Sequence, residues 1–357
     1  MGADLEPGVR LKEIRSKCLT VTHEFVVARC RDELGGHRGG GFVADALTSF
    51  LAGGKFLRPV FAYIGWTCGG AESDAALRAA GSLELLHCFA LVQDDVMDGS
   101  SLRRGKPALH RRMAQWHREE GLSGSPEKFG ESAAVLLADL FLVWSERMLR
   151  ECGLPAAALS RGWPRYDDLR AELAVGQFSD LVNDAGRAPG WDSVLDVLRR
   201  KSGNYTVRRP LEFGAALAGC GEQQLAGLSA YGRLVGEAFQ FRDDLLGVFG
   251  DPRVTGKPVG EDLRDRKATS VVVLAAELAD PAQARELRAL TRLDAVEPAD
   301  VRRWQALIAA TGAPGELERM IGRRSADALE AVERAGLPDP ARAALAELAS
   351  SCTERAR

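Results

Sequence analysis

Apolar residues recur at intervals of three and four positions along almost the whole chain, and runs that alternate apolar and polar residues are scarce. This period is that of an α-helix with one buried face. Clear examples are residues 77–98, 132–152, 228–250 and 269–279. Breaks rich in Gly and Pro separate the periodic segments, and no internal repeat or linker is visible. We therefore predict an all-α, single-domain bundle of ten or more helices over residues 16–357, preceded by a segment, residues 1–15, that can be mobile.

The bulk composition narrows the class of protein. The 357 residues are 46% hydrophobic and 27% charged with a net charge of −3, which is typical of a globular protein and gives no electrostatic reason to expect nucleic acid. Seven scattered cysteines lack metal-site spacing and are expected to be reduced thiols. The N-terminus does not resemble a secretory signal, and no uninterrupted apolar run approaches eighteen residues. We expect a cytoplasmic protein with no membrane span.

Negative charge is concentrated after one apolar segment, where Asp94, Asp95 and Asp98 lie within five residues. On a helix, Asp94 and Asp98 are one turn apart on the same face. Carboxylates this close need a counter-charge, and Mg²⁺ supplies one through oxygen ligands while it keeps positions open to water and phosphate. Arg103 and Arg104 follow, and guanidinium groups bind phosphate oxygens bidentately. The stretch is therefore interpreted as a metal and phosphate site rather than a solvated acidic helix end.

A second acidic pair, Asp243 and Asp244, follows Gln240 on another apolar segment. A glycine-rich loop that carries Lys257 and Lys267 comes next. Two separate acidic helix ends indicate more than one metal ion around one polyanion. The GxxxxGK[ST] pattern is absent, so no nucleotide P-loop is indicated.

Further cationic residues lie in two short glycine-containing stretches: Lys55 and Arg58 in GGKFLRP, and Lys201 in RKSGNYT. His87 stands two turns before the first acidic cluster, so it is either a buried core residue or a ligand contact. Each of these residues alone would usually be structural or solvated. Together they fit a site that handles more than one phosphorylated group.

The order and spacing of these stretches resemble those of the trans-isoprenyl diphosphate synthases, or polyprenyl synthetases, over about residues 40–270. The matching stretches are GGKFLRP, ELLHCFALVQDDVMDGSSLRRGKPALH, GQFSDL, KSGNYT and FQFRDDLLGVFGDPRVTGKPVGEDLRDRKAT. The resemblance implies the isoprenoid synthase fold with a deep central cavity, usually in a homodimer. It also implies a prenyltransferase that uses two or three Mg²⁺ ions to condense isopentenyl diphosphate with allylic diphosphates of C5–C15.

The resemblance also implies roles for individual residues. The implied metal ligands are Asp94, Asp98 and Asp243, with Asp95 and Asp244 in support. The implied contacts of the allylic diphosphate are Arg103, Lys201 and Lys257. The implied contacts of isopentenyl diphosphate are Lys55, Arg58, His87 and Arg104. Ser202 and Gln240 would line the reaction site, and Lys267 would be a further phosphate contact.

The chain departs from the family pattern at two positions. Gly247 stands where many members carry a third aspartate, which weakens one expected metal contact. Gln93 replaces a common histidine before the first acidic cluster, and we draw nothing from it.

Product length in the family is set by the side chains before the first aspartate pair. Ala90 lies one turn before Asp94 and faces roughly the same way, so that a growing prenyl tail can pass it. Phe89 lies more to the side and can form a later wall. The pattern of an aromatic residue followed by a small one resembles that of geranylgeranyl diphosphate synthases, so a C20 product is predicted. Farnesyl (C15) and C25 products remain alternatives.

Two rival interpretations remain. One is a class I terpene cyclase, which also uses a DDxxD motif. Such a cyclase would carry an (N/D)DxxSxxxE element as well, and the nearest candidate in this chain, at Asn183, lacks the serine and the glutamate. A non-catalytic partner subunit would be expected to have lost one acidic cluster or the arginine pair, and this chain keeps both.

Overall fold

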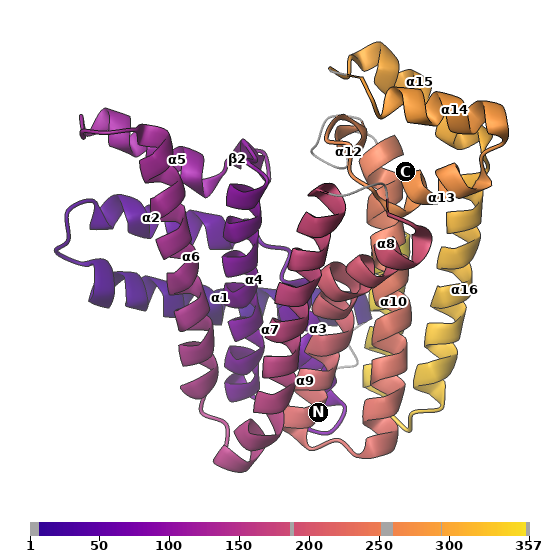
Figure 1. Ribbon diagram of the computed structural model, residues 1–357. Helices are drawn as coiled ribbons and strands as arrows, with labels where there is room; N and C mark the ends of the chain where they lie inside the picture. Colours follow the sequence, from indigo (N-terminus) through magenta and orange to yellow (C-terminus); the bar gives the residue numbers. More distant parts are fainter. Residues whose placement is uncertain (1–6, 186–188, 251–259, 294, 355–357) are drawn as a thin grey trace. The chain divides into compact units, whose positions relative to one another are not determined.

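The computed structural model describes residues 7–185, 189–250, 260–293 and 295–354. All long elements of this part of the chain are helices (Figure 1), and its strands, β1 (Leu102–Arg103) and β2 (Lys106–Pro107), have two residues each. The prediction of an all-α fold with ten or more helices is therefore confirmed.

The chain divides into two compact units. We call them the N-terminal unit (Met1–Gly162 with Gly214–Gly219) and the C-terminal unit (Trp163–Phe213 with Cys220–Arg357). Helices α7 (Ala156–Ala185) and α9 (Arg209–Ala218) contribute residues to both units. Helix α1 (Pro7–Leu34) already includes residues 7–15 of the segment expected to be mobile. The predicted domain boundary at residue 16 stays a prediction.

Helix α4 (Asp74–Met97) is the central helix of the N-terminal unit. It begins after Ser73, whose hydroxyl accepts a hydrogen bond from the backbone N–H of Ala76 at 3.3 Å and so caps the first turn. Helices α1, α3 and α6 pack against it, and because they cover several of its sides, α4 is apolar nearly all round. The further helices of this unit are α2 (Gly40–Ala52), α3 (Leu57–Thr67), α5 (Leu109–Glu119) and α6 (Pro126–Arg150).

Among the described residues, α4 alone has the length and apolar composition of a membrane span. However, 67% of its most apolar window is buried inside the structure, as in the core helix of a globular domain.

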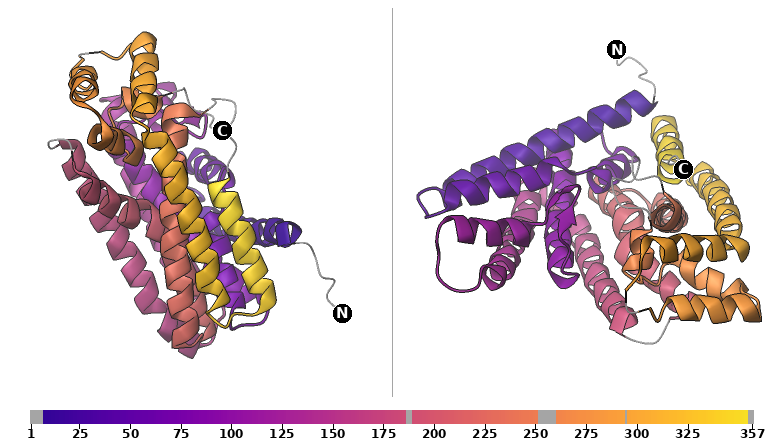
Figure 2. Two further views of the ribbon diagram at one scale, coloured as in Figure 1. Left: turned by 90° about the vertical axis from the view of Figure 1, so that its right-hand side faces the viewer. Right: turned by 90° about the horizontal axis from the view of Figure 1, so that it is seen from above.

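Helix α10 (Glu222–Phe249) is the central helix of the C-terminal unit. Packed against it are the π-helix η1 (Leu198–Arg208), α13 (Ser270–Leu278), α16 (Ala313–Glu333) and α17 (Asp339–Thr353). Figures 1 and 2 show α16 and α17 running beside it. The remaining helices of this unit are α8 (Trp191–Val197), α12 (Glu261–Arg264), α14 (Pro281–Leu290) and α15 (Pro298–Ala310).

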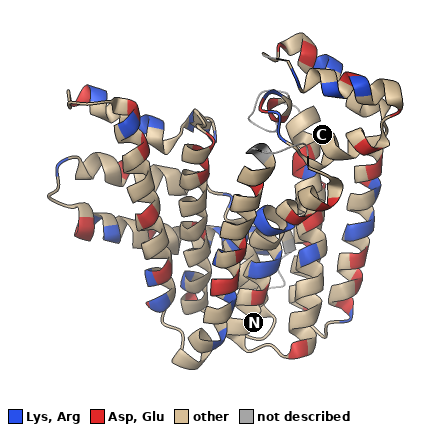
Figure 3. Ribbon diagram, viewed as in Figure 1, with Lys and Arg blue, Asp and Glu red and all other residues tan. Residues whose placement is uncertain are grey.

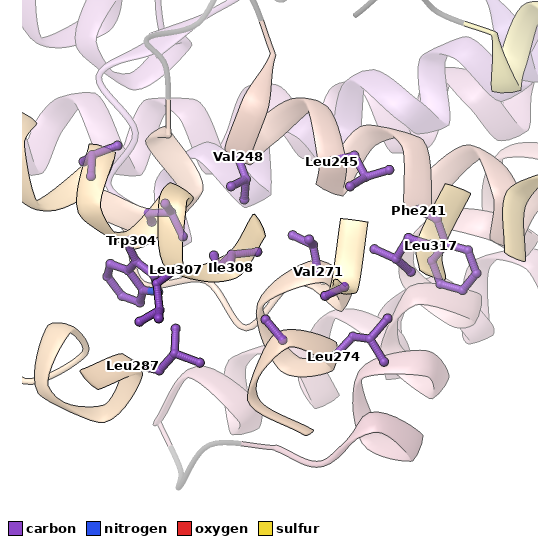
Figure 4. Packing of buried hydrophobic residues seen from close by; sticks show 14 of the residues in the cluster. Phe241, Leu245, Val248, Val271, Leu274, Leu287, Trp304, Leu307, Ile308 and Leu317 are labelled. Atoms are coloured by element: carbon purple, nitrogen blue, oxygen red, sulfur yellow. The ribbon is translucent and has the colours of Figure 1, made fainter. Parts of the chain in front are cut away.

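A buried apolar cluster joins α10 to the helices that follow it in the sequence (Figure 4). It includes residues from α10, α13, α14, α15 and α16, among them Phe241, Leu245, Val248, Val271, Leu274, Leu287, Trp304, Ile308 and Leu317. The amphipathic helices after residue 280, which carry no predicted chemistry, therefore supply the core that supports the second acidic segment.

Helices η1 and α10 cross at two glycines. A Cβ added to Gly203 would lie 2.9 Å from the carbonyl carbon of Gly236, and one added to Gly236 would lie 2.6 Å from the carbonyl oxygen of Gly203. Only glycine permits so close a backbone approach. Beside the crossing, Glu237 accepts hydrogen bonds from Nε of Arg199 (2.8 Å) and Nε of Arg324 (2.5 Å), which link η1, α10 and α16. Helix α16 carries both signs of charge along its length (Figure 3).

Candidate active site

The first acidic cluster lies at the C-terminal end of α4, in the N-terminal unit. Asp98 caps the helix, and its backbone N–H donates to the carbonyl oxygen of Asp94 at 2.8 Å. The side chain of Asp94 is 21% exposed, whereas that of Asp95 is 1% exposed. The helix thus points Asp94 toward solvent and Asp95 into the protein, as their separation of about 100° around a helix requires.

Arg103 supplies counter-charge to this cluster. It lies on β1, next to a two-residue turn in which Arg104 and Gly105 both have positive φ angles (55° and 73°), as such turns require. Its Nε donates to Oδ1 of Asp95 at 2.8 Å, and its Nη2 donates to Oδ2 of Asp94 at 3.2 Å. The predicted crowding of like charges is therefore relieved here by a guanidinium group.

The carboxyl group of Asp95 is only partly satisfied by Arg103. Burial raises the pKa of Asp95, against the opposing effect of its hydrogen bonds from Arg103. Its second oxygen, Oδ2, is buried and accepts no hydrogen bond in the described part of the chain. A buried polar atom without a partner is rare in native proteins. This oxygen, together with the carboxylates of Asp94 and Asp98, offers the hard oxygen donors that Mg²⁺ prefers.

The N-terminal unit also gathers a group of cationic residues around His87. Burial lowers the pKa of His87 well below its usual value, and the charges of Arg58, Arg104 and Arg103 lower it further. His87 is therefore held neutral, with guanidinium groups of α3 and of the β1–β2 hairpin close enough to influence it. Nη1 of Arg104 donates to the carbonyl oxygen of Phe50 at 3.2 Å, which ties the β1–β2 turn to α2.

Lys55 is exposed in the loop Gly53–Lys55, just before α3. Phe56, which follows it, is fully buried and takes the left-handed conformation with φ 56°, so the chain turns sharply there. The loop is thereby held while its lysine stays at the surface. Arg58 lies in the first turn of α3, and the structure thus places Lys55, Arg58, His87 and Arg104 in one unit, as a common site requires.

The second acidic pair lies near the C-terminal end of α10. Asp244 is buried, and its Oδ1 accepts a hydrogen bond from Gln240 at 2.8 Å. Its Oδ2 accepts from the backbone N–H and the hydroxyl group of Ser270, at 2.8 and 2.6 Å, and so caps α13. Burial raises the pKa of Asp244 to about 6. Asp244 thus fixes α13 on α10, which leaves its half-buried neighbour Asp243 as the more accessible carboxylate.

Lys201 and Ser202 lie on η1, a π-helix, a rare form that is frequently found at functional sites. Nζ of Lys201 forms an ion pair with Oδ2 of Asp180 at 2.5 Å. Asp180 belongs to the GQFSDL stretch, whose residues have no predicted role. Lys257 lies outside the described residues. Lys267 is exposed after α12, where its backbone N–H donates to the carbonyl oxygen of Asp262 at 2.8 Å.

The structure gives a reason for Gly247 in place of a third aspartate. A Cβ at this position would lie 1.9 Å from Oδ2 of Asp262, on α12. The carboxylate of Asp262 thus occupies the space that a side chain at 247 would fill, one helical turn beyond Asp243. Sequence reasoning missed Asp262, since only the fold brings it to this position.

Within the described residues, no group of three or more His, Cys, Asp or Glu side chains surrounds a single metal position. The donors nevertheless fit Mg²⁺. At the first cluster Asp95 presents a buried oxygen without a partner, and at the second the space above Gly247 is lined by carboxylate oxygen.

Three comparisons with known proteins bear on the site. The family model for polyprenyl synthetase matches residues 42–308. A geranylgeranyl diphosphate synthase of Mycobacterium tuberculosis is 33% identical over 93% of this chain and 89% of its own length. A (2E,6E)-farnesyl diphosphate synthase of Mycobacterium bovis is 32% identical over 85% of this chain and 80% of its own length. A crystal structure of geranylgeranyl pyrophosphate synthase from Corynebacterium glutamicum, complexed with isoprenyl diphosphate and magnesium, superposes with a TM-score of 0.88 at 36% identity and covers 100% of both chains.

Restoring an aspartate at position 247 is expected to destabilise the protein. In Gly247→Asp the new side chain would meet Asp262 and would add a like charge, so we expect a loss of about 1–3 kcal/mol in the free energy of unfolding. Urea denaturation followed by circular dichroism measures it. The matched control is Gly322→Asp, because Gly322 is exposed on α16 and a Cβ there meets nothing within 4 Å. Equal stability of the two variants would contradict the packing argument.

Proposed function

The chain belongs to the polyprenyl synthetase family and is a prenyltransferase, and on this premise we propose that it condenses isopentenyl diphosphate with allylic diphosphates of C5–C15 in a Mg²⁺-dependent reaction. The observation that carries the proposal is the arrangement within the N-terminal unit. The unit holds an acidic cluster at the C-terminal end of α4 and, two turns earlier on the same helix, His87 under the influence of Arg58 and Arg104, so it offers sites of opposite charge for metal-bound and metal-free diphosphates.

The cationic group is the proposed site of isopentenyl diphosphate. Arg58 and Arg104 supply guanidinium groups, whose fork matches phosphate oxygens, and Lys55 adds an exposed point charge. His87 is neutral and can donate one N–H to a phosphate oxygen without titrating in the physiological range. Holding the substrate here would fix its double bond relative to the allylic carbon, which makes the attack effectively unimolecular.

The acidic clusters are the proposed sites of two or three Mg²⁺ ions, with Asp94, Asp98 and Asp243 as ligands and Asp95 and Asp244 in support. Bound there, Mg²⁺ would stabilise the charge that develops on the departing diphosphate. Arg103, Lys201 and Lys257 would bind the same diphosphate, and Lys267 would add a further contact. In the structure Arg103 and Lys201 form ion pairs with carboxylates, which orient both side chains.

The remaining site residues would shape the reaction rather than carry charge. Gln240 is fixed by its hydrogen bond to Asp244, so its amide keeps one orientation near the end of α10. Ser202 is half-buried on η1, where the glycine crossing with α10 holds the backbone. We assign no protein side chain as the proton acceptor. The released diphosphate is the base that the proposed reaction itself supplies.

A geranylgeranyl (C20) product is proposed. Phe89 and Ala90 are both half-buried on α4, before the acidic cluster, so their side chains are available to line a prenyl channel. Relatives with different products, a geranylgeranyl, a farnesyl and a nonaprenyl diphosphate synthase among them, have similar identities to this chain, at 33%, 32% and 30%. A geranylfarnesyl (C25) diphosphate synthase is also 32% identical. Overall identity therefore does not distinguish C20 from C15 or C25, and the argument depends on the small side chain at position 90.

We also propose a cytoplasmic homodimer that associates through α6. Leu136 and Val143 lie two turns apart on one face of this helix and are 66% and 58% exposed. Large apolar side chains in such a row favour burial against a second copy. The other proposed partners are the two diphosphate substrates, and neither nucleic acid nor a membrane is required.

The synthase activity is tested with purified protein, labelled isopentenyl diphosphate and C5, C10 and C15 allylic primers in turn. We expect condensation that EDTA abolishes, and a loss of roughly 10²-fold or more in kcat/KM for Asp94→Asn, because a metal ligand is removed. The matched control is Asp74→Asn, in the exposed first turn of the same helix, which should keep near wild-type activity. If the protein condensed isopentenyl diphosphate with none of the three primers, the synthase function would be rejected. A cyclase would instead consume a C20 diphosphate without isopentenyl diphosphate, and a non-catalytic subunit would do neither.

Product length is tested with Ala90→Phe. A phenyl group at this position should block the tail one turn before Asp94, so the dephosphorylated product should shift from C20 to C15 or shorter. Ala90→Ser is the control and should still give C20. An unchanged product from Ala90→Phe would place the floor of the channel elsewhere, without affecting the proposed chemistry.

The dimer is tested with Leu136→Arg. Burying a charge in an apolar interface is costly, so the variant should shift from dimer to monomer in sedimentation-velocity experiments. The control is Leu329→Arg, at an exposed apolar position of α16, which should stay dimeric. A wild-type monomer, or a dimer unaffected by Leu136→Arg, would contradict an interface through α6.

A further inference from the structure

One buried acidic residue near the cationic group has no hydrogen-bond partner in the described part of the chain. Glu84 lies on α4, three residues before His87, and is 1% exposed. Both of its carboxyl oxygens are buried, and neither accepts a hydrogen bond from the described residues. Burying an ionised carboxylate without hydrogen bonds is among the costlier features a fold can contain. Such a group therefore calls for a functional explanation.

The carboxyl group of Glu84 lies directly beneath the Gly53–Lys55 loop. A Cβ added to Gly54 would lie 2.3 Å from Oε1 of Glu84, so the carboxyl group lies directly against the backbone of the loop and a side chain at position 54 would displace it. The carbonyl oxygen of Gly54 accepts a hydrogen bond from Nη2 of Arg15 at 3.2 Å. A Cβ on Gly53 would lie 3.3 Å from Nη1 of Arg104. The loop is thus held between Glu84 on one side and guanidinium groups on the others.

The charged and titratable groups that influence Glu84, or that it influences, come from three helices and the β1–β2 turn. They are Arg15 and Cys18 of α1, Arg58 of α3, Cys88 of α4, and Arg104 of the turn. His87, three residues further along α4, is influenced by two of the same arginines, Arg58 and Arg104. Burial raises the pKa of both thiols and lowers that of the imidazole, so all three groups are neutral at pH 7. The three guanidinium groups are therefore the charges that act on Glu84.

Burial and these cations act on Glu84 in opposite directions. Burial raises the pKa of Glu84 to about 7, and Arg58, Arg104 and Arg15 partly oppose it. The carboxyl group is therefore about half ionised near neutral pH, where a small change in the local electrostatic potential changes its protonation. A diphosphate anion bound to Arg58 and Arg104 would cancel much of their positive potential. The pKa of Glu84 would then rise, and the neutral acid would be favoured.

We propose that Glu84 is the internal counter-charge of the isopentenyl diphosphate site, ionised while the site is empty and protonated when the diphosphate binds. In the empty site its negative charge offsets the guanidinium groups around the Gly53–Lys55 loop. On binding, one carboxyl oxygen takes a proton from solvent, and the diphosphate replaces the carboxylate as the counter-charge. Glu84 is a positioning residue, because it acts on the substrate through the arginines. This inference rests on the proposed function of the cationic group.

The test is calorimetric titration of isopentenyl diphosphate into the whole protein without an allylic primer, at fixed excess Mg²⁺. Two buffers with different ionisation enthalpies give the number of protons taken up. At pH 7 we expect the wild type to take up about half a proton more than Glu84→Gln, since a group with a pKa near 7 is half ionised there. At pH 5.5 the difference should vanish. At pH 8 Glu84→Gln should bind up to about tenfold more tightly than the wild type, because it needs no proton.

Controls separate this effect from general damage. Glu151→Gln removes an exposed carboxylate from the same unit and should behave like the wild type. Glu84→Leu replaces the acid with an apolar group of similar size, a change that buried charges often tolerate, and should also lose the extra proton. Equal proton uptake by the wild type and both Glu84 variants would overturn the inference and leave the proposed function intact. Absence of isopentenyl diphosphate binding to the wild type would instead reject the proposed site itself.

Discussion

The structure depends on how negative charge at the end of a buried helix is balanced. Helix α4 is apolar on nearly every side, yet it ends in three aspartates, and Asp95 is directed into the protein. Arg103 of the adjacent β-hairpin neutralises this end of the helix. Its hydrogen bond to Asp95 fixes the hairpin and therefore also the position of Arg104. One charge-assisted contact therefore couples the proposed metal site to the proposed diphosphate site.

Buried carboxylates in this protein are stabilised in different ways, which correspond to different tasks. Glu237 is paired with arginines, whose hydrogen bonds lower its pKa against the opposing effect of burial, and it links η1, α10 and α16. Asp244 is saturated by neutral donors and caps α13. Glu84 has no hydrogen-bond partner in the described residues, and the charges of Arg58, Arg104 and Arg15 only partly oppose the effect of its burial. The first two arrangements are rigid, and the third can change its charge state.

Several parts of the candidate site could be predicted because they are local in the sequence. The helical period and the spacing of Asp94 and Asp98 follow from 3.6 residues per turn, and the structure has both. The two acidic segments, with the arginines that follow the first, were enough to indicate the family that the comparisons then established. The departure at Gly247 was visible in the sequence as a missing aspartate, but its reason was not, because Asp262 reaches that space only in the folded chain.

The sequence by itself determined the all-α class and the family, and it supplied the set of polar residues that we propose for the chemistry, because each depends on residue type and short-range spacing. The tertiary structure alone decided how these residues divide their tasks. It made Asp244 a cap while Asp243 stays more accessible, paired Lys201 with Asp180, and placed Glu84 under the Gly53–Lys55 loop. These outcomes depend on burial and on contacts between segments far apart in the chain, and burial is what converts an ordinary carboxylate into a paired, capped or titratable one.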